Sequence, residues 1–385
     1  MKPNLAHASF SSALDRRSWL KSTGLAAFAG LTVGSRLITP SARAQHEADR
    51  SARRTEPVRL AGNENPFGPS QMATMAMMQS LEKTFRYAGS EARDLIKLIA
   101  EKEGVAEENI VMGVGSGEIL EIYGMYLGKD KGEVVTVTPG YLQMVRAMER
   151  MGTKVVAVPL NSKLEHDLDA MAAKVGPNTK CVYICNPNNP TGTIVDAAKL
   201  KAFAIEISKK CPVFIDEAYL QCADNFEANT MAGLVREGHN VAVARTFSKL
   251  YGLAGQRIGY GVMKAETAAA VKEYSTGSLN LLGVVAAQAS LEDPTYASET
   301  VAKIKAGRNA LIDVVKGLGK KYAEPHGNFV FIQTGMPIAM FQEKMRAENV
   351  IVARPFPPML DWARITIGLP EEMAICHAAL KKVLA

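Results

Sequence analysis

The chain has 385 residues, 47% hydrophobic and 22% charged, a composition typical of a globular protein large enough for two domains. Its formal net charge is +6, but residues 1–44 hold six basic residues and one acid, so the remaining 39 basic and 38 acidic residues nearly balance. This balance argues against a nucleic-acid-binding protein, and the spacing of the five cysteines matches no metal site.

The first 44 residues are typical of a leader that exports folded proteins. Arg16 and Arg17 form a twin-arginine pattern, residues 24–33 are apolar, and Ala42-Arg43-Ala44 has the small-x-small pattern of a cleavage site. The apolar stretch is shorter than the roughly 20 residues that cross a bilayer. We therefore expect a twin-arginine signal peptide over 1–44, recognition by the twin-arginine translocase and a periplasmic location. The alternative is a disordered basic N-terminus.

The next segments predict an arm followed by an α/β domain. Residues 45–75 are polar and then rich in Gly, Asn and Pro, which predicts an extended N-terminal arm. From about 90 to 260, strand-like runs alternate with stretches of helical periodicity. We expect strands at 110–114, 133–137, 154–158, 181–185, 213–216, 241–245 and 258–262. This alternation predicts a mainly parallel seven-stranded sheet covered by helices on both faces.

The C-terminal part of the chain shows a second pattern. A long helical stretch near 279–318 precedes three short apolar runs at 329–333, 350–353 and 364–368, which are again mixed with helices. We therefore expect a large α/β domain over 76–285 and a smaller α/β domain over 286–385.

Distinctive polar residues fall where the predicted strands end. Asp216 ends one strand, Tyr219 follows it, and Asn189 lies in the Asn- and Pro-rich turn after another strand. Functional sites of open α/β sheets lie at the carboxyl ends of the strands, so these side chains are expected to share a site. Taken singly, Asp216 is also consistent with a helix N-cap, and the turn with an ordinary loop.

Lys249 is the residue with the most specific surroundings. It follows Ser248 and precedes a Gly-rich turn, and Arg257 comes eight residues later. A lysine can form a Schiff base with a cofactor aldehyde while a hydroxyl and an arginine hold a phosphate, and pyridoxal phosphate requires both. A carboxylate such as Asp216 keeps the pyridine nitrogen of that cofactor protonated. Alone, the segment is also consistent with a loop of solvated charges.

Two further turns contain candidate cofactor-binding residues. Residues 113–118 leave a strand and open a helix, so the amides of Ser116 and Gly117 would face an anion, although the turn lacks the dinucleotide-binding spacing. Tyr141 also begins a helix after a strand, where it could stack on a cofactor ring or simply belong to the core. Asn189 and Tyr219 could contact a ring hydroxyl.

Together these segments resemble fold type I pyridoxal-phosphate enzymes, which have the aspartate-aminotransferase-like fold. Among them, the chain is most similar to the histidinol-phosphate aminotransferases. The resemblance runs from about Leu60 to the C-terminus and is carried by residues 62–68, 185–192, 216–219, 245–257 and 364–368.

The resemblance implies a role for each cofactor-binding position. Lys249 would form the Schiff base with pyridoxal 5'-phosphate and move a proton between the substrate and the cofactor. Asp216 would pair with the ring nitrogen, and Asn189 and Tyr219 with the ring hydroxyl. The phosphate and the ring face would be held by Ser116, Gly117, Ser248, Arg257 and Tyr141.

The same resemblance implies residues that contact the substrate and a second subunit. Arg364 would bind the substrate carboxylate through its planar guanidinium, with Arg354 and Asn65 at further substrate-side positions. Tyr87 would reach the cofactor phosphate of the neighbouring subunit in a homodimer.

Two segments depart from the family pattern close to these contacts. Ala88-Gly89 replaces the usual Pro-Asp or Pro-Glu, and residues 142–144 lack the usual Ser-Met-Tyr. We expect an aminotransferase that moves an amino group between an amino acid or related amine and an oxo acid. The alternatives are histidinol-phosphate aminotransferase itself, another fold type I enzyme (a lyase, decarboxylase or racemase) and a non-catalytic binding protein with this fold.

Overall fold

The computed structural model describes residues 56–275 and 277–385. The predicted leader lies outside these residues. By its contacts, Pro57–Ala385 forms one compact unit, to which the description below is confined. Within the described ranges, no helix is both long enough and apolar enough to cross a membrane.

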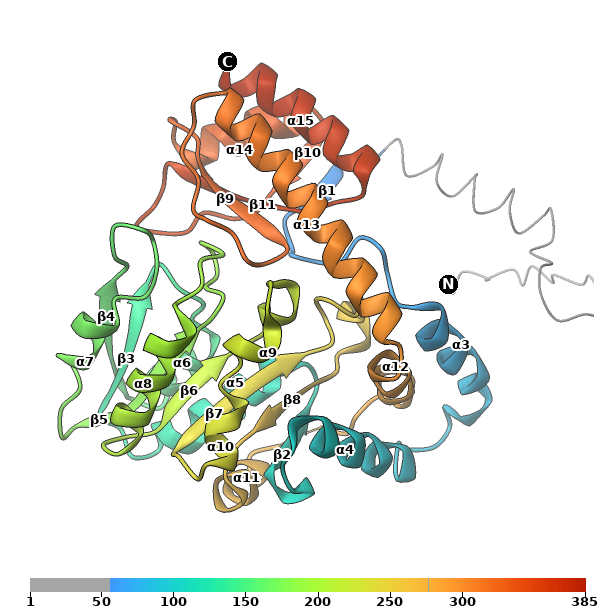
Figure 1. Ribbon diagram of the computed structural model, residues 1–385, viewed down its shortest axis with the longest axis vertical. Coiled ribbons are helices and arrows are strands. Elements are labelled where there is room, and N and C mark those ends of the chain that lie inside the picture. Colours follow the sequence, from blue (N-terminus) through green and yellow to red (C-terminus); the bar gives the residue numbers. More distant parts are fainter. Residues whose placement is uncertain (1–55, 276) are drawn as a thin grey trace, which may run out of the picture. The chain divides into compact units, whose positions relative to one another are not determined.

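The centre of this unit is a seven-stranded sheet with the strand order β2-β8-β7-β6-β5-β3-β4 (Figure 1). Its strands are β2 (Ile110–Gly113), β3 (Glu133–Thr138), β4 (Lys154–Pro159), β5 (Thr179–Cys185), β6 (Val213–Asp216), β7 (Val241–Thr246) and β8 (Gly259–Val262). Only β8 pairs antiparallel with its neighbours, β2 and β7, and the other pairs are parallel. The predicted mainly parallel seven-stranded sheet is confirmed.

Helices cover both faces of the sheet, because its strands are apolar on both sides. In β5, Cys181 and Tyr183 belong to one apolar core and Val182 and Ile184 to another, since successive side chains point to opposite faces. The first core includes α5 (Ser116–Gly128), α6 (Gln143–Arg150) and α11 (Ala265–Lys272). The second includes α7 (Leu168–Ala172), α8 (Ala197–Ser208) and α10 (Ala232–Arg236).

Four short strands form two further sheets. β9 (Phe329–Gln333) pairs antiparallel with β11 (Trp362–Thr366), and β1 (Val58–Leu60) pairs parallel with β10 (Val350–Val352). Their core is shared with α13 (Pro294–Gly317), α14 (Ile338–Ala347) and α15 (Pro370–Leu384). The predicted arm therefore contributes a strand to the C-terminal part. The domain boundaries proposed from the sequence stay predictions.

The long helical stretch predicted near 279–318 is two helices, α12 (Leu281–Leu291) and α13. The stretch is divided at Pro294, because proline suits the first turn of a helix and disrupts its interior. Pro294 begins α13, and the Asp293 side chain caps it. The remaining helices are α3 (Gln71–Gln79), α4 (Ser90–Glu103) and α9 (Phe226–Asn229), with 3-10 turns at Leu81–Lys83, Glu107–Asn109, Leu220–Cys222 and Ala254–Gln256.

Candidate active site

Asp216 and Tyr219, which were predicted at a strand end, line a cavity of about 630 Å³ together with Lys249. β6 ends at Asp216, β7 leads into Lys249, and the turn after β2 opens α5, so parallel strands bring these segments to one edge of the sheet. The cavity wall includes Gly62, Glu64, Ser116, Gly117, Tyr141, Gln143, Asp216, Tyr219, Thr246, Ser248, Lys249 and Arg257.

One end of this cavity is suited to an anion. Ser116 and Gly117 begin α5, and the first N–H groups of a helix have no acceptor inside it. The Arg257 guanidinium lies beside them and donates from Nη1 to Ser248 Oγ at 3.3 Å. Gly115 has φ +76°, and a Cβ there would lie 3.0 Å from Arg257 Cζ, so glycine permits this approach. Amides, a hydroxyl and a guanidinium together fit a phosphate group.

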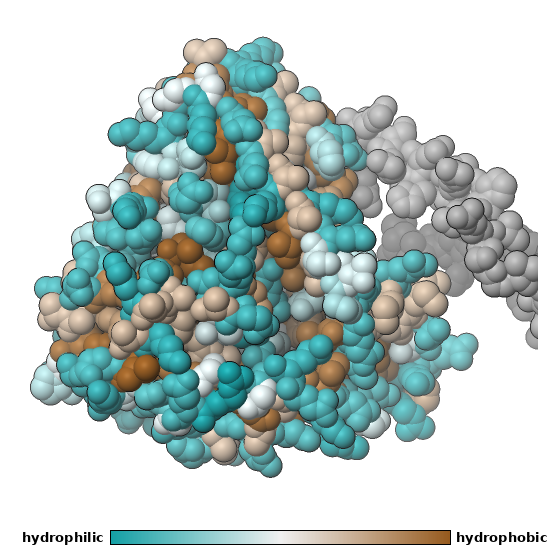
Figure 2. All heavy atoms as spheres, viewed as in Figure 1, coloured by the Kyte–Doolittle hydropathy of each residue, from teal (hydrophilic) through white to brown (hydrophobic). Residues whose placement is uncertain are grey.

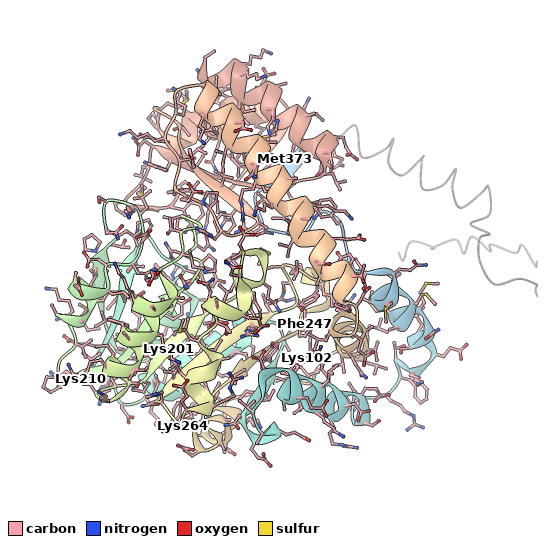
Figure 3. The ribbon with its side chains drawn as sticks, viewed as in Figure 1. Lys102, Lys201, Lys210, Phe247, Lys264 and Met373 are labelled. Carbon is pink, nitrogen blue, oxygen red and sulfur yellow. The ribbon has the colours of Figure 1, made fainter. Side chains whose placement is uncertain are left out.

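The turn that carries Ser248 and Lys249 is anchored by Phe247. Figure 3 labels Phe247 among the interior side chains, and it is 1% exposed. Its ring packs on Tyr251 and Tyr260, with centroids 5.3 and 6.0 Å away. A packed anchor of this kind fixes the backbone from which Ser248 and Lys249 project into the cavity.

Lys249 places an amine of lowered basicity in the cavity. Its Nζ donates to the Gly62 carbonyl at 3.3 Å and lies 5.4 Å from the centroid of the Tyr219 ring. Burial, aided by the charge of Arg364, lowers the pKa of Lys249 to about 8. Such an amine is partly neutral near physiological pH, and the neutral form is the one that acts as a nucleophile or base.

Asp216 places a buried carboxylate in the same cavity. Its side chain accepts from the Tyr183 hydroxyl at 3.2 Å and from the Ala218 amide at 3.1 Å. Burial raises the pKa of Asp216 to about 6. A cation against this carboxylate would favour its ionised form, so the site fits a protonated ring nitrogen.

A hydrogen-bond chain joins Tyr219 to Arg364. The Tyr219 hydroxyl accepts from Asn189 Nδ2 at 3.2 Å and from Asn63 Nδ2 at 3.1 Å. Arg364 donates to Asn189 Oδ1 and to the Ala61 carbonyl, both at 2.6 Å. Its Nε is buried and has no partner among the described residues, so an incoming carboxylate would supply the missing acceptor. Burial also lowers the pKa of Arg364 to about 10.

Five residues predicted for the site do not line the cavity. Asn189 and Arg364 are linked to its wall through the Tyr219 hydroxyl, as described above. The other three are Asn65, Arg354 and Tyr87. Asn65 is engaged within the protein, since its Nδ2 donates to the Leu250 carbonyl at 2.7 Å. Arg354 is exposed, with its guanidinium 4.5 Å from the centroid of the Phe356 ring. Tyr87 is 86% exposed. The roles expected of Asn65, Arg354 and Tyr87 stay predictions.

The sequence interpretation missed three residues that the structure places in the site: Asn63, Tyr183 and Gln143. A signal existed for Tyr183, because residues of β5 alternate between the two faces and Tyr183 lies next to the strand that carries Asp216. For Asn63 the signal was limited to its place in segment 62–68, which carries the resemblance, because its contact with Tyr219 depends on the tertiary fold.

Comparisons with known proteins agree with this geometry. Residues 55–379 match the model of the family described as aminotransferase class I and II. Histidinol-phosphate aminotransferase of Akkermansia muciniphila is 35% identical over 328 residues, which are 85% of this chain and 90% of that protein. The enzyme of that name from Moorella thermoacetica is 34% identical over 331 residues, which are 85% of this chain and 86% of that protein.

Solved structures are similar over most of the chain. Histidinol-phosphate aminotransferase from Sinorhizobium meliloti, in complex with pyridoxal-5'-phosphate, has a TM-score of 0.77 and 28% identity, covering 94% of this chain and 99% of that chain. Aspartate aminotransferase from Thermus thermophilus, at 21% identity and a TM-score of 0.75, covers 92% of this chain and all of that chain, and shows the same fold. The chain therefore belongs to the class I and II aminotransferases, and it is a pyridoxal-phosphate-dependent aminotransferase.

Proposed function

We propose that the residues of this cavity divide the work of transamination between an amino acid, or a related amine, and an oxo acid. When bound, pyridoxal phosphate supplies an aldehyde that bonds to amines and a protonated ring that withdraws electrons from the substrate. Ser248, Arg257 and the first amides of α5 hold its phosphate. Asp216 holds the ring nitrogen in its protonated state.

Lys249 moves the proton. Its neutral Nζ removes the proton from the substrate Cα and holds it for return to a carbon of the cofactor. The observation that carries this proposal is the buried amine itself, because a pKa of about 8 leaves part of Lys249 neutral at physiological pH.

Arg364 orients the substrate. Its unpartnered Nε and the remaining N–H groups of its guanidinium can bind the substrate carboxylate in a planar fork. A carboxylate held in this way does not leave as carbon dioxide, while the Cα–H bond is accessible to Lys249. Arg364 thus favours transamination over decarboxylation.

Histidinol phosphate is a narrower candidate for the amino donor. Two relatives of 34–35% identity carry the name histidinol-phosphate aminotransferase. The guanidinium groups of Arg354 and Arg364 lie 4.5 and 5.0 Å from the centroid of the Phe356 ring, and the charge of Arg354 contributes to lowering the pKa of Arg364. Both cations could therefore attract a substrate phosphate.

The test is a half-reaction with the cofactor-loaded protein. Single amino donors, including histidinol phosphate, are added without an acceptor, and the products are measured by mass spectrometry. We expect one oxo product per active site, and then transfer of the amino group once an oxo acid is added. K249A should release none above background. Release of carbon dioxide, or ammonia without transfer, would instead indicate a decarboxylase or a lyase.

A homodimer is proposed because one surface strip is unusually apolar. Along α3 and the turn after it, Met72, Met75, Met78, Leu81, Phe85 and Tyr87 are 45–86% exposed. Figure 2 shows apolar side chains at the α3 edge, as well as over other parts of this face. Exposed strips of this kind mark protein–protein contacts. A second copy would cover the strip and receive Tyr87 near its phosphate site.

Export by the twin-arginine route is proposed from the leader sequence alone. Arg16 and Arg17 would be recognised by the translocase, and the folded chain would reach the periplasm with its cofactor. Cell fractionation tests this proposal on the full chain and on the R16K/R17K variant. We expect wild type in the periplasm and the variant in the cytoplasm. Wild type found only in the cytoplasm would contradict it.

A further inference from the structure

Gln143, the first residue of α6, has both ends of its side-chain amide engaged in the active-site wall. Its Oε1 accepts from the Tyr141 hydroxyl at 2.8 Å, and its Nε2 donates to the Gly117 carbonyl at 3.0 Å. Tyr141 is the residue expected to stack on the cofactor ring, and Gly117 lies in the helix start that faces the phosphate. One side chain therefore bridges the two ends of the cofactor site.

The chemistry of both partners fixes the orientation of this amide. Burial raises the pKa of Tyr141 to about 12, so its hydroxyl stays protonated and donates. The Gly117 carbonyl can only accept. The amide offers an acceptor and a donor at adjacent positions, which matches these two partners. The Gln143 amide also packs closely on Gly117, since a Cβ on Gly117 would lie 3.1 Å from both polar atoms of that amide.

The bridge is not needed to hold α5 and α6 together. These helices already pack closely, because Met144 and Met148 of α6 are fully buried against α5. A Cβ on Gly124 of α5 would lie 2.8 Å from Ala147 Cβ of α6. The Gln143 hydrogen bonds instead act on a ring and a turn that face the cavity.

We propose that Gln143 is a positioning residue that fixes the Tyr141 ring and couples it to the phosphate-holding turn. This inference rests on the proposed function, in which Tyr141 stacks on the cofactor ring and the first amides of α5 hold the phosphate. Gln143 lies in the segment 142–144, which the resemblance identified as a departure from the usual pattern.

The first experiment compares Q143M, which has a similar length but no amide, with wild type. The dissociation constant of pyridoxal phosphate is measured on cofactor-free protein, and the circular dichroism of bound cofactor reports how its ring is held. Each lost neutral hydrogen bond is worth a factor of about three to ten, so we expect cofactor binding roughly tenfold weaker and an altered dichroism. The melting temperature of the cofactor-free protein should fall no further than in a variant that loses a comparable hydrogen bond away from the cavity.

Q342M is the matched control. Gln342 Nε2 donates to the Ala353 carbonyl at 2.7 Å, so this variant breaks a similar bond, and Gln342 lies on α14 and does not line the cavity. We expect it to bind the cofactor with the wild-type dissociation constant. Equal weakening in Q143M and Q342M would overturn the proposal, because it would indicate a general loss of structure.

A double-mutant cycle tests the coupling to Tyr141. Y141F removes the donated hydroxyl, and Q143M combined with Y141F should be little worse than the more damaging single variant. Additive effects would overturn the proposal, as would wild-type binding and dichroism in Q143M. Failure of the wild-type protein to bind pyridoxal phosphate would instead overturn the proposed function, so the two failures are distinguishable.

Discussion

At the scale of single residues, the burial of Lys249 has a consequence for stability. Its pKa falls from about 10.5 to about 8 in the folded, cofactor-free chain. The folded chain therefore loses this proton at a lower pH than the unfolded chain does. Between these two values the unfolded chain binds more protons than the folded chain. The free energy of unfolding contributed by this residue therefore rises with pH across that range.

The prediction compares the cofactor-free wild type with K249M, which cannot titrate at this position. From pH 8 to pH 10.5, the free energy of unfolding of wild type should rise relative to that of K249M, because the penalty of burying a charged amine disappears. Urea denaturation at several pH values measures the difference. A constant difference between the two proteins across this range would contradict the lowered pKa.

The site residues differ in how far the sequence could identify them. Lys249 and Asp216 were predictable because their chemistry is rare and their neighbours in the chain are informative. Asn63 was not, because its hydrogen bond to Tyr219 joins residues 156 positions apart. Gln143 stands out in the sequence only as a departure from the family pattern, because its hydrogen bond to Gly117 joins residues 26 positions apart.

At the scale of elements, the contact between β8 and α5 sets the place of the phosphate-holding turn. Gly259 of β8 lies directly against the start of α5, where a Cβ would come within 2.7 Å of the Gly115 carbonyl carbon and closer still to the Ser116 nitrogen. Backbone atoms cannot move aside as a flexible side chain can. The glycine therefore allows the helix start to approach the sheet.

G259A should displace the first turn of α5 and weaken pyridoxal phosphate binding at least tenfold, since a displacement of about 1 Å is costly in a site of this kind. G317A, at the end of α13 with no atom within 4 Å of the added methyl group, is the control and should bind normally. Equilibrium dialysis gives both dissociation constants. Normal binding by G259A would show that the turn tolerates the shift.

The elements themselves were largely predictable. All seven predicted strands of the main sheet are present, because long apolar runs between helical stretches are a strong local signal. The pairing of Val58 with Val350 could not be predicted from the sequence, since a three-residue strand is too short to show periodicity and its partner lies near the other end of the chain. The antiparallel direction of β8 likewise depends on the path of the chain and not on its composition.

At the scale of the whole molecule, the apolar strip along α3 makes a prediction about assembly. Phe85 is 77% exposed, and in a dimer it would be desolvated next to Tyr87. F85E would bury a charge in that contact, so it should raise the dimer dissociation constant at least tenfold and lower activity with it.

M340E is the matched control, because Met340 is 47% exposed on α14, away from the strip. Light scattering during gel filtration measures the mass of wild type and both variants over a range of concentrations. We expect wild type and M340E to be dimeric where F85E is monomeric. A dimeric F85E would place the subunit contact elsewhere.

The long-range contacts of Asn63 also order events during synthesis. The main sheet is complete once Val262 has left the ribosome, but Asn63 must wait for Asn328 and Thr366, to which it is hydrogen-bonded. At roughly 5–20 residues per second, that wait is on the order of ten seconds. A nascent chain would thus possess the phosphate-holding turn and Lys249 well before Arg364 is synthesised. Its cofactor site would therefore form before its substrate site.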